Sequence, residues 1–397
     1  MKTMLATLAL LIAAVGAARA AASECDNLFG QHCLVNLATG VHMSYFELGP
    51  EGGEPLILLH TDTTAAVEWA WTAAALHNRD PALRIYALDQ RGAGATDLPD
   101  TPRCWTKPNL CITRAELAAD VLAFMDAKGI ARATLVGHAM GAGAARSVAL
   151  ASPHRVVRLI LSGTGAPAAQ TAPAGKRASL AQAAGAAPPP GARSDPLGPL
   201  GWQKMLESKG VKWPQQALHM RPLDIDPDAV RNITRHWDIS VIAAPEVVET
   251  IAAQTAGESL ASWGVIDPTR PPPEAPEALD RLSVPTLVLW GSEDAGLDRA
   301  SQDRLIALLR RASLTPGMYF YWKQYGVRPP PRSGDKHDAD DIGHNLSWEA
   351  PRQLAADIDS FVRTGAPTRD LYRTDAPNDI RKILVEPGKA IIVSSLP

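Results

Sequence analysis

Short apolar runs that end in turn residues recur along the chain, and segments of helical periodicity separate them. Six such runs lie at residues 55–60, 84–89, 133–137, 157–162, 285–291 and 317–323. They are continuously apolar rather than alternating, which is typical of strands covered on both faces in a mainly parallel sheet. The pattern therefore predicts a doubly wound α/β fold with helices on both sides of the sheet.

Helix signals accompany two of the intervening segments. Thr113 and Glu116 have capping-box spacing, apolar residues follow at helical intervals, and Gly129 is a natural stop. Ser347 is the predicted cap of a second helix that runs to about Val362. The remaining residues, 365–397, end in two strand-like runs, ILV and AIIV, and form a C-terminal extension of unassigned role.

The alternation of strand and helix breaks between residues 163 and 280, where the chain becomes rich in alanine and proline. Composition favours an extended surface segment at 166–195 and helices at 200–265. We therefore expect a core made of residues 23–162 and 281–364, with residues 163–280 inserted as a mostly helical cap. Four of the ten tryptophans fall in this insertion, at Trp202, Trp213, Trp237 and Trp263.

The first 22 residues have the pattern of a secretory signal. Lys2 supplies a positive start, residues 4–15 are apolar, and small residues at 18–20 or 20–22 offer a cleavage site. The apolar run is too short to span a bilayer, so no membrane span is expected. The predicted localisation is secreted or periplasmic.

Overall composition adds little beyond this. Hydrophobic residues make up 46% of the 397 residues and charged residues 20%, which suits a sizeable core. The formal net charge is −3, and no long block of like charge indicates nucleic acid or anionic lipid as a partner. We expect a small-molecule partner.

The predicted export affects how the four cysteines are interpreted. Cys25 and Cys33 are eight apart, and Cys104 and Cys111 are seven apart. An oxidising compartment favours two local disulfides among the three possible pairings. A zinc site is the alternative, but neither pair has CxxC spacing, so no metal is expected.

The strongest candidate for chemistry is the run G-H-A-M-G at 137–141, where a strand passes into a small-residue helix. It resembles the nucleophile elbow G-x-S-x-G of the α/β-hydrolase superfamily, whose serine is replaced here by Ala139. Two further runs resemble that family in the same order: a strand that ends at His60, and D-Q-R-G-A-G-A-T at 89–96. The resemblance implies a serine hydrolase with a cap that roofs the pocket.

Beyond the insertion, the resemblance continues. Asp294 follows a strand in W-G-S-E-D, as the acid of the family does, and Glu293 and Asp298 are alternative acids. Gly343 and His344, followed by Glu349 and Pro351, are similar to the segment around the catalytic histidine. The order nucleophile, acid, histidine is that of the fold. His138, inside the elbow, is interpreted as a packing or hydrogen-bonding residue rather than a base.

By resemblance, the oxyanion donors are Met140 and either Thr61 or Asp62, and no cofactor is required. Aromatic residues imply an apolar or aromatic substrate. The candidates for binding it are Trp69, with Trp71 beside it, and three tryptophans of the insertion, Trp202, Trp237 and Trp263. Each of these tryptophans alone is equally well explained as part of a hydrophobic core.

Ala139 leaves two interpretations open. It is either an inactivating replacement of the serine of a hydrolase, or the native residue of a protein that binds without cleaving. The retained acid and histidine favour the first, because a dyad without a nucleophile has no evident use. The function predicted is hydrolysis of an ester or lactone. A proline-iminopeptidase-like peptidase is the other enzymatic possibility. A cap carboxylate that binds the free amine of the substrate would favour it, and the candidates are Glu207, Glu246 and Glu249.

Overall fold

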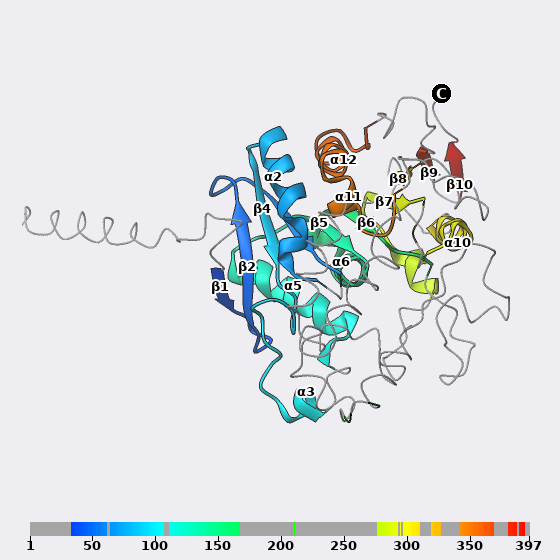
Figure 1. The fold of residues 1–397 in the computed structure, drawn as a ribbon. Helices are drawn as coiled ribbons and strands as arrows, with labels where there is room; N and C mark the ends of the chain where they lie inside the picture. The colour runs from blue at the N-terminus through cyan, green and yellow to red at the C-terminus, as the bar shows by residue number, and fades with distance from the viewer. Residues whose placement is uncertain are drawn as a thin grey trace, which may run out of the picture.

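One sheet of ten strands organises the molecule (Figure 1). The computed structural model describes residues 33–61, 64–106, 111–166, 208, 210, 276–292, 294, 297–309, 319–326, 342–368, 380–386 and 389–393. The predicted signal at 1–22 and most of the predicted insertion at 163–280 lie outside these residues.

The strand order is β1-β2-β4-β3-β5-β6-β7-β8-β9-β10. All neighbours from β4 to β8 are parallel, whereas β1, β2, β9 and β10 pair antiparallel. The strands are β1 (Cys33–Asn36), β2 (His42–Leu48), β3 (Glu54–Leu59), β4 (Leu83–Leu88), β5 (Ala133–His138), β6 (Val156–Ser162), β7 (Thr286–Gly291), β8 (Tyr319–Tyr325), β9 (Ile380–Glu386) and β10 (Lys389–Val393). The mainly parallel, doubly wound sheet predicted from the apolar runs is confirmed.

Helices cover both faces of this sheet (Figure 1). Apolar residues of α5, α6 and α10 pack on one face, and those of α2, α11 and α12 pack on the other. The helical segments are η1 (Ala66–Trp69), α2 (Ala70–Arg79), α3 (Pro102–Thr106), α5 (Arg114–Ala127), α6 (Met140–Ala151), η2 (Pro153–Arg155), η8 (Pro276–Arg281), α10 (Arg299–Leu309), α11 (Leu346–Glu349) and α12 (Pro351–Thr364).

Of the two predicted helix caps, one is present in the structure and the other is not. Thr113 caps α5, since its side chain accepts a hydrogen bond from the Glu116 backbone N–H (3.2 Å), and Gly129 follows the helix with φ +67°. The prediction that Ser347 caps the later helix is wrong. Ser347 lies inside the short helix α11, and a separate helix begins at Pro351, whose fixed φ and missing N–H suit a first helical position.

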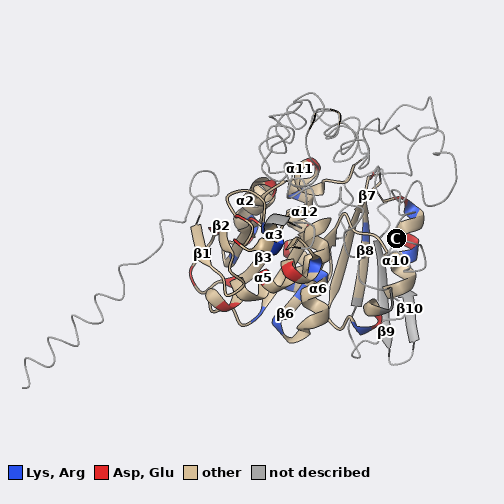
Figure 2. Cartoon of the chain, turned by 90° about the horizontal axis from the view of Figure 1, so that it is seen from below, with Lys and Arg blue, Asp and Glu red and all other residues tan. Residues whose placement is uncertain are grey.

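Charged residues are spread over many elements of the described chain, with both signs interspersed (Figure 2). This distribution agrees with the small net charge of −3. Within the described ranges, no helix combines the length and the apolar character that crossing a bilayer requires. The same residues contain no cluster of three or more His, Cys, Asp or Glu side chains able to hold a metal ion.

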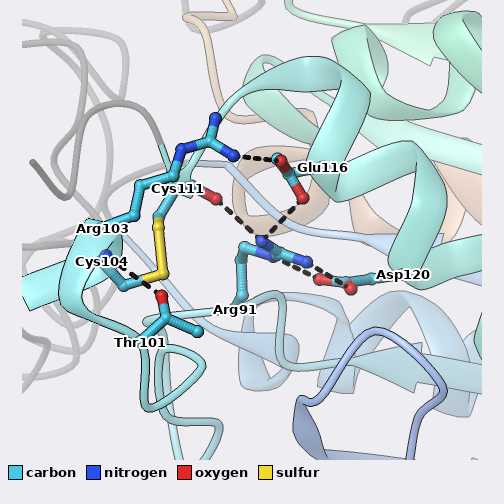
Figure 3. The surroundings of a disulfide bond; sticks show 7 residues. All are labelled: Arg91, Thr101, Arg103, Cys104, Cys111, Glu116 and Asp120. Atoms are coloured by element: carbon cyan, nitrogen blue, oxygen red, sulfur yellow. Dashed lines mark hydrogen bonds and ion pairs between the residues drawn. A yellow bond between two sulfur atoms is a disulfide. The ribbon is translucent and has the colours of Figure 1, made fainter.

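A disulfide joins Cys104 and Cys111, whose Cα atoms are 5.3 Å apart (Figure 3). The buried guanidinium of Arg91 ties this loop to the core, because it donates to the Cys111 carbonyl (2.9 Å) and pairs with Asp120 (2.6 Å). Cys33 is also disulfide-bonded, and its predicted partner, Cys25, lies outside the described residues.

Removing the Cys104–Cys111 bond should destabilise the protein measurably. The double variant Cys104→Ser/Cys111→Ser is expected to lose about 2–3 kcal/mol of unfolding free energy, because the crosslink restricts a short loop of the unfolded chain. Urea unfolding measures the loss, and peptide mapping without reductant identifies the bond in the parent chain. A free thiol at either cysteine would contradict the pairing.

Candidate active site

The elbow between β5 and α6 holds Ala139 in a strained backbone conformation. Its φ of 47° and ψ of −105° make it the one non-glycine residue with positive φ in the described part of the chain. Such a conformation costs roughly 1–3 kcal/mol and persists only where the surroundings impose it. The Ala139 N–H donates to the Ser162 carbonyl on the neighbouring strand (3.0 Å), which helps to hold the turn.

Both glycines of the elbow are required by close backbone approach. A methyl group on Gly137 would lie 2.3 Å from the Gly141 carbonyl oxygen, and one on Gly141 would lie 2.2 Å from that of Leu59. The first turn of α6 therefore packs directly on the ends of β3 and β5. This packing presents position 139 above the carboxyl edge of the sheet, as a nucleophile elbow does.

Asp294 and His344 meet at the same edge. The His344 Nδ1 lies 2.7 Å from the Asp294 Oδ2, and Asp294 is buried. Asp294 follows β7, and its other oxygen accepts the Leu297 backbone N–H (3.0 Å). The segment that carries His344 crosses closely over the end of β7, where a methyl group on Gly291 would lie 1.9 Å from the Gly343 carbonyl oxygen.

Of the two alternative acids, only Asp298 lies among the described residues. Asp298 instead caps α10, since its carboxylate accepts the Ser301 backbone N–H (2.7 Å). Glu293 lies outside the described residues. Glu349, which the sequence matched to the family's segment after the histidine, accepts the Gly343 backbone N–H (3.0 Å) and so fixes the loop that precedes His344.

A second carboxylate–imidazole pair adjoins this dyad. The His138 Nδ1 lies 2.7 Å from the Glu68 Oε1, and both side chains are almost completely buried. His138 was predicted to be a packing or hydrogen-bonding residue, whereas Glu68 was not predicted. No motif surrounds Glu68, which lies in η1 after the loop that follows β3. An acidic residue among apolar neighbours, in A-V-E-W-A-W, was the available signal.

The Asp89 side chain holds the start of η1 in position. One oxygen of the Asp89 carboxylate accepts the Ala66 backbone N–H (2.8 Å), at the start of the segment that carries Glu68. Its other oxygen accepts the Ala95 N–H (3.1 Å). A methyl group on Gly94 would lie 2.3 Å from this carboxylate, so the D-x-R-G-x-G run folds tightly around its own aspartate.

The pKa of the Glu68 carboxyl is lowered despite its burial. Desolvation opposes ionisation, but the charge of His138 and the hydrogen bonds from His138, Thr64 and Thr61 lower the pKa of Glu68 below its usual 4.5. A carboxylate with a lowered folded-state pKa stabilises the fold above its unfolded pKa, and this contribution is lost as the pH falls through the folded value.

Replacing Glu68 by glutamine should therefore flatten the acid dependence of stability. Between about pH 5 and pH 3, the Tm of Glu68→Gln is expected to fall less steeply than that of the parent chain, because the variant has no carboxylate to protonate there. Thermal unfolding at a series of pH values measures this. Glu51→Gln, at an exposed position before β3, is the control. Equal slopes in all three proteins would contradict the assignment.

The structure corrects one candidate oxyanion donor. The Thr61 backbone N–H donates to the Glu68 Oε2 (2.9 Å), so it is directed at a protein carboxylate rather than at the site. Met140 begins α6, where N–H groups of the first turn have no acceptor within the helix and favour negative charge. Asp62 lies outside the described residues.

The tryptophan candidates fall into three groups. Trp69 is completely buried in the core cluster that also contains apolar residues of β3, α2 and α12, which corrects its assignment as a substrate-binding residue. Trp71 is 39% exposed and makes an edge-on contact with Trp348, with ring centroids 5.2 Å apart. Trp202, Trp237 and Trp263 lie outside the described residues.

Comparison with known proteins agrees with this fold. The model of the "alpha/beta hydrolase fold" family matches residues 54–195, which include the elbow. The chain has the α/β-hydrolase fold. It is 27% identical over 348 residues to a 2-hydroxy-6-oxononadienedioate/2-hydroxy-6-oxononatrienedioate hydrolase of Burkholderia vietnamiensis, covering 83% of this chain and 94% of that protein.

The other similarities of this chain are more limited. It is 35% identical over 119 residues to the dihydrolipoyllysine-residue acetyltransferase component of the acetoin cleaving system of Pseudomonas putida. That match covers 30% of this chain and only 29% of the relative. The crystal structure of the enol-lactonase from Burkholderia xenovorans superposes with a TM-score of 0.56 at 17% identity, covering 83% of this chain and all of that one. At this identity the likeness shows the fold alone.

Proposed function

We propose that this chain has the site of an exported serine hydrolase that acts on an ester or lactone of an apolar or aromatic small molecule, with alanine in place of the nucleophile. The contact between His344 Nδ1 and Asp294 Oδ2 (2.7 Å) carries this proposal. It occurs beside an elbow that keeps the strained conformation of a nucleophile although Ala139 has no hydroxyl. A complete acid–histidine pair serves a nucleophile at this position.

The proposed chemistry follows from the geometry. Asp294 accepts the Nδ1–H of His344, which leaves Nε2 as the acceptor for a serine proton. A serine at position 139 would attack the carbonyl carbon while His344 takes its proton. The leaving alcohol would then receive that proton, and water would release the acyl group by the same route. The N–H of Met140, at the positive end of α6, supports the developing oxyanion.

A small-molecule substrate agrees with the hydrolase relative from Burkholderia vietnamiensis, which matches this chain over most of both lengths. The apolar or aromatic character of the substrate rests on the tryptophan content of the insertion. Export rests on the signal pattern of the first 22 residues. No cofactor takes part in the proposed steps.

Ala139 itself supports a second candidate, a native binding protein that retains the fold without turnover. The peptidase alternative has no support from the described residues, because its candidate carboxylates lie outside them. A panel of chromogenic esters, lactones and aminoacyl substrates, tested with an Ala139→Ser variant, separates the three functions. Hydrolysis of esters or lactones supports the proposal, aminoacyl hydrolysis supports the peptidase, and no turnover by the folded variant supports the binding protein.

A further inference from the structure

Glu68 connects three segments that border the site. Its Oε2 accepts hydrogen bonds from the Thr61 backbone N–H (2.9 Å) and the Thr64 hydroxyl (2.6 Å), in the segment after β3. Its Oε1 lies 2.7 Å from the His138 Nδ1, next to the elbow, and 3.2 Å from the Ser347 hydroxyl, in α11. Ser347 is three residues beyond His344. One buried carboxylate thus links the loop after β3, the elbow and the segment of the catalytic histidine.

The ring of His138 also packs against His344. The two ring centroids are 4.7 Å apart, with the ring planes inclined by 48°. A methyl group on Gly163 would lie 2.7 Å from the His138 Nε2 and 2.8 Å from the His344 Cε1, so the two rings meet over a residue that has no side chain. Gly163 also has φ +56°, a conformation that favours glycine.

We propose that Glu68 and His138 form a positioning pair, which holds the His344 ring and the loop after β3 in place relative to the elbow. This inference rests on the proposed function, in which His344 is the base. The hydrogen bond to Glu68 fixes the ring plane of His138, and the His344 ring packs against the His138 ring. The same carboxylate fixes the peptide of Thr61 and the hydroxyl of Ser347, so all three segments shift if the pair is broken.

The hydrogen bond, rather than ring volume, is the essential part of this pair. Nδ1 donates to Glu68, whereas Nε2 is buried and has no hydrogen-bond partner among the described residues. An apolar ring would avoid the cost of roughly 1–3 kcal/mol that an unpaired buried polar atom carries. The presence of histidine is therefore explained by the donor at Nδ1. Phenylalanine keeps the ring without the donor, and asparagine keeps a donor near the Nδ1 position without the ring.

These two variants distinguish a positioning role of His138 from a role in packing alone. In the Ala139→Ser background, His138→Phe is expected to lower kcat about 100-fold with little change in KM, because small displacements of catalytic groups have effects of that order. His138→Asn should lower kcat less than 10-fold. A role in packing alone predicts the reverse order, since phenylalanine fills the volume and asparagine leaves a void. The reverse order, or equal kcat values in all three proteins, would overturn the proposal.

A second measurement needs no activity and uses the chain as it is. In 15N-histidine NMR spectra, the His344 resonances should move more in His138→Phe than in His138→Asn. Asp357→Asn, which breaks the buried pair of Asp357 and Lys323 (2.8 Å) between α12 and β8, is the matched control. It should lower the Tm without moving the His344 signals. Unmoved His344 signals in His138→Phe would refute the positioning role, whereas an inert Ala139→Ser variant with moved signals would refute only the proposed function.

Discussion

Ala139→Ser is expected to convert the chain into a hydrolase with a large gain in turnover. Loss of the nucleophile from a complete triad lowers kcat by roughly a million-fold in a well-studied protease. That factor corresponds to about 8 kcal/mol of transition-state stabilisation. The gain should approach this size because Asp294 and His344 are already in contact and the elbow already has its strained form. Initial rates on chromogenic esters and lactones measure it.

The double variant Ala139→Ser/His344→Ala is the control for this gain. A serine without a base is a weak nucleophile, so the double variant should return to the level of the parent chain. The parent chain itself should bind substrate without turnover, since binding does not require the hydroxyl. Activity that survives loss of His344 would mean that another group is the base. A folded Ala139→Ser variant without activity on the whole panel would support a native binding protein.

The parallel part of the sheet could be predicted because its strands are buried on both faces. Continuous apolar runs such as residues 55–60 are a strong signal for that environment, and all six correspond to strands. The antiparallel strand β2 was missed. Its buried residues include Ser44 and Glu47, so it presents no continuous apolar run. Glu47 is accommodated there by ion pairs with Arg84 (2.8 Å) and Lys128 (3.2 Å), which come from distant parts of the chain.

Some residues of the candidate site could likewise be predicted from the sequence, and others could not. Ala139, Asp294 and His344 follow short motifs at strand ends, and the fold brings such positions to one edge of the sheet. The Glu68–His138 pair has no comparable signal, because its partners are 70 positions apart and only the tertiary structure shows that they touch. The roles of Thr61 and Ser347 were misjudged for the same reason. Both were interpreted from local sequence. Both in fact donate hydrogen bonds to Glu68, which no local motif indicated.

The acid of the dyad can be tested with a matched pair of aspartates. In the Ala139→Ser background, Asp294→Asn is expected to lower kcat by about 10⁴, the effect of the equivalent change in a serine protease. The asparagine amide would donate to the His344 Nδ1, which places the imidazole proton on Nε2. A histidine in that tautomer cannot accept the serine proton, although the geometry is nearly unchanged.

Asp298→Asn is the appropriate comparison, because Asp298 follows the same strand but caps α10 through the Ser301 N–H (2.7 Å). Asparagine is also a good helix cap, so this variant should keep both the fold and the activity. Circular dichroism confirms that each variant is folded before rates are compared. A large loss in Asp298→Asn with little loss in Asp294→Asn would reverse the assignment of the acid. Equal, small losses in both would show that His344 does not depend on a carboxylate for its tautomer, and the triad mechanism would then be wrong for this site.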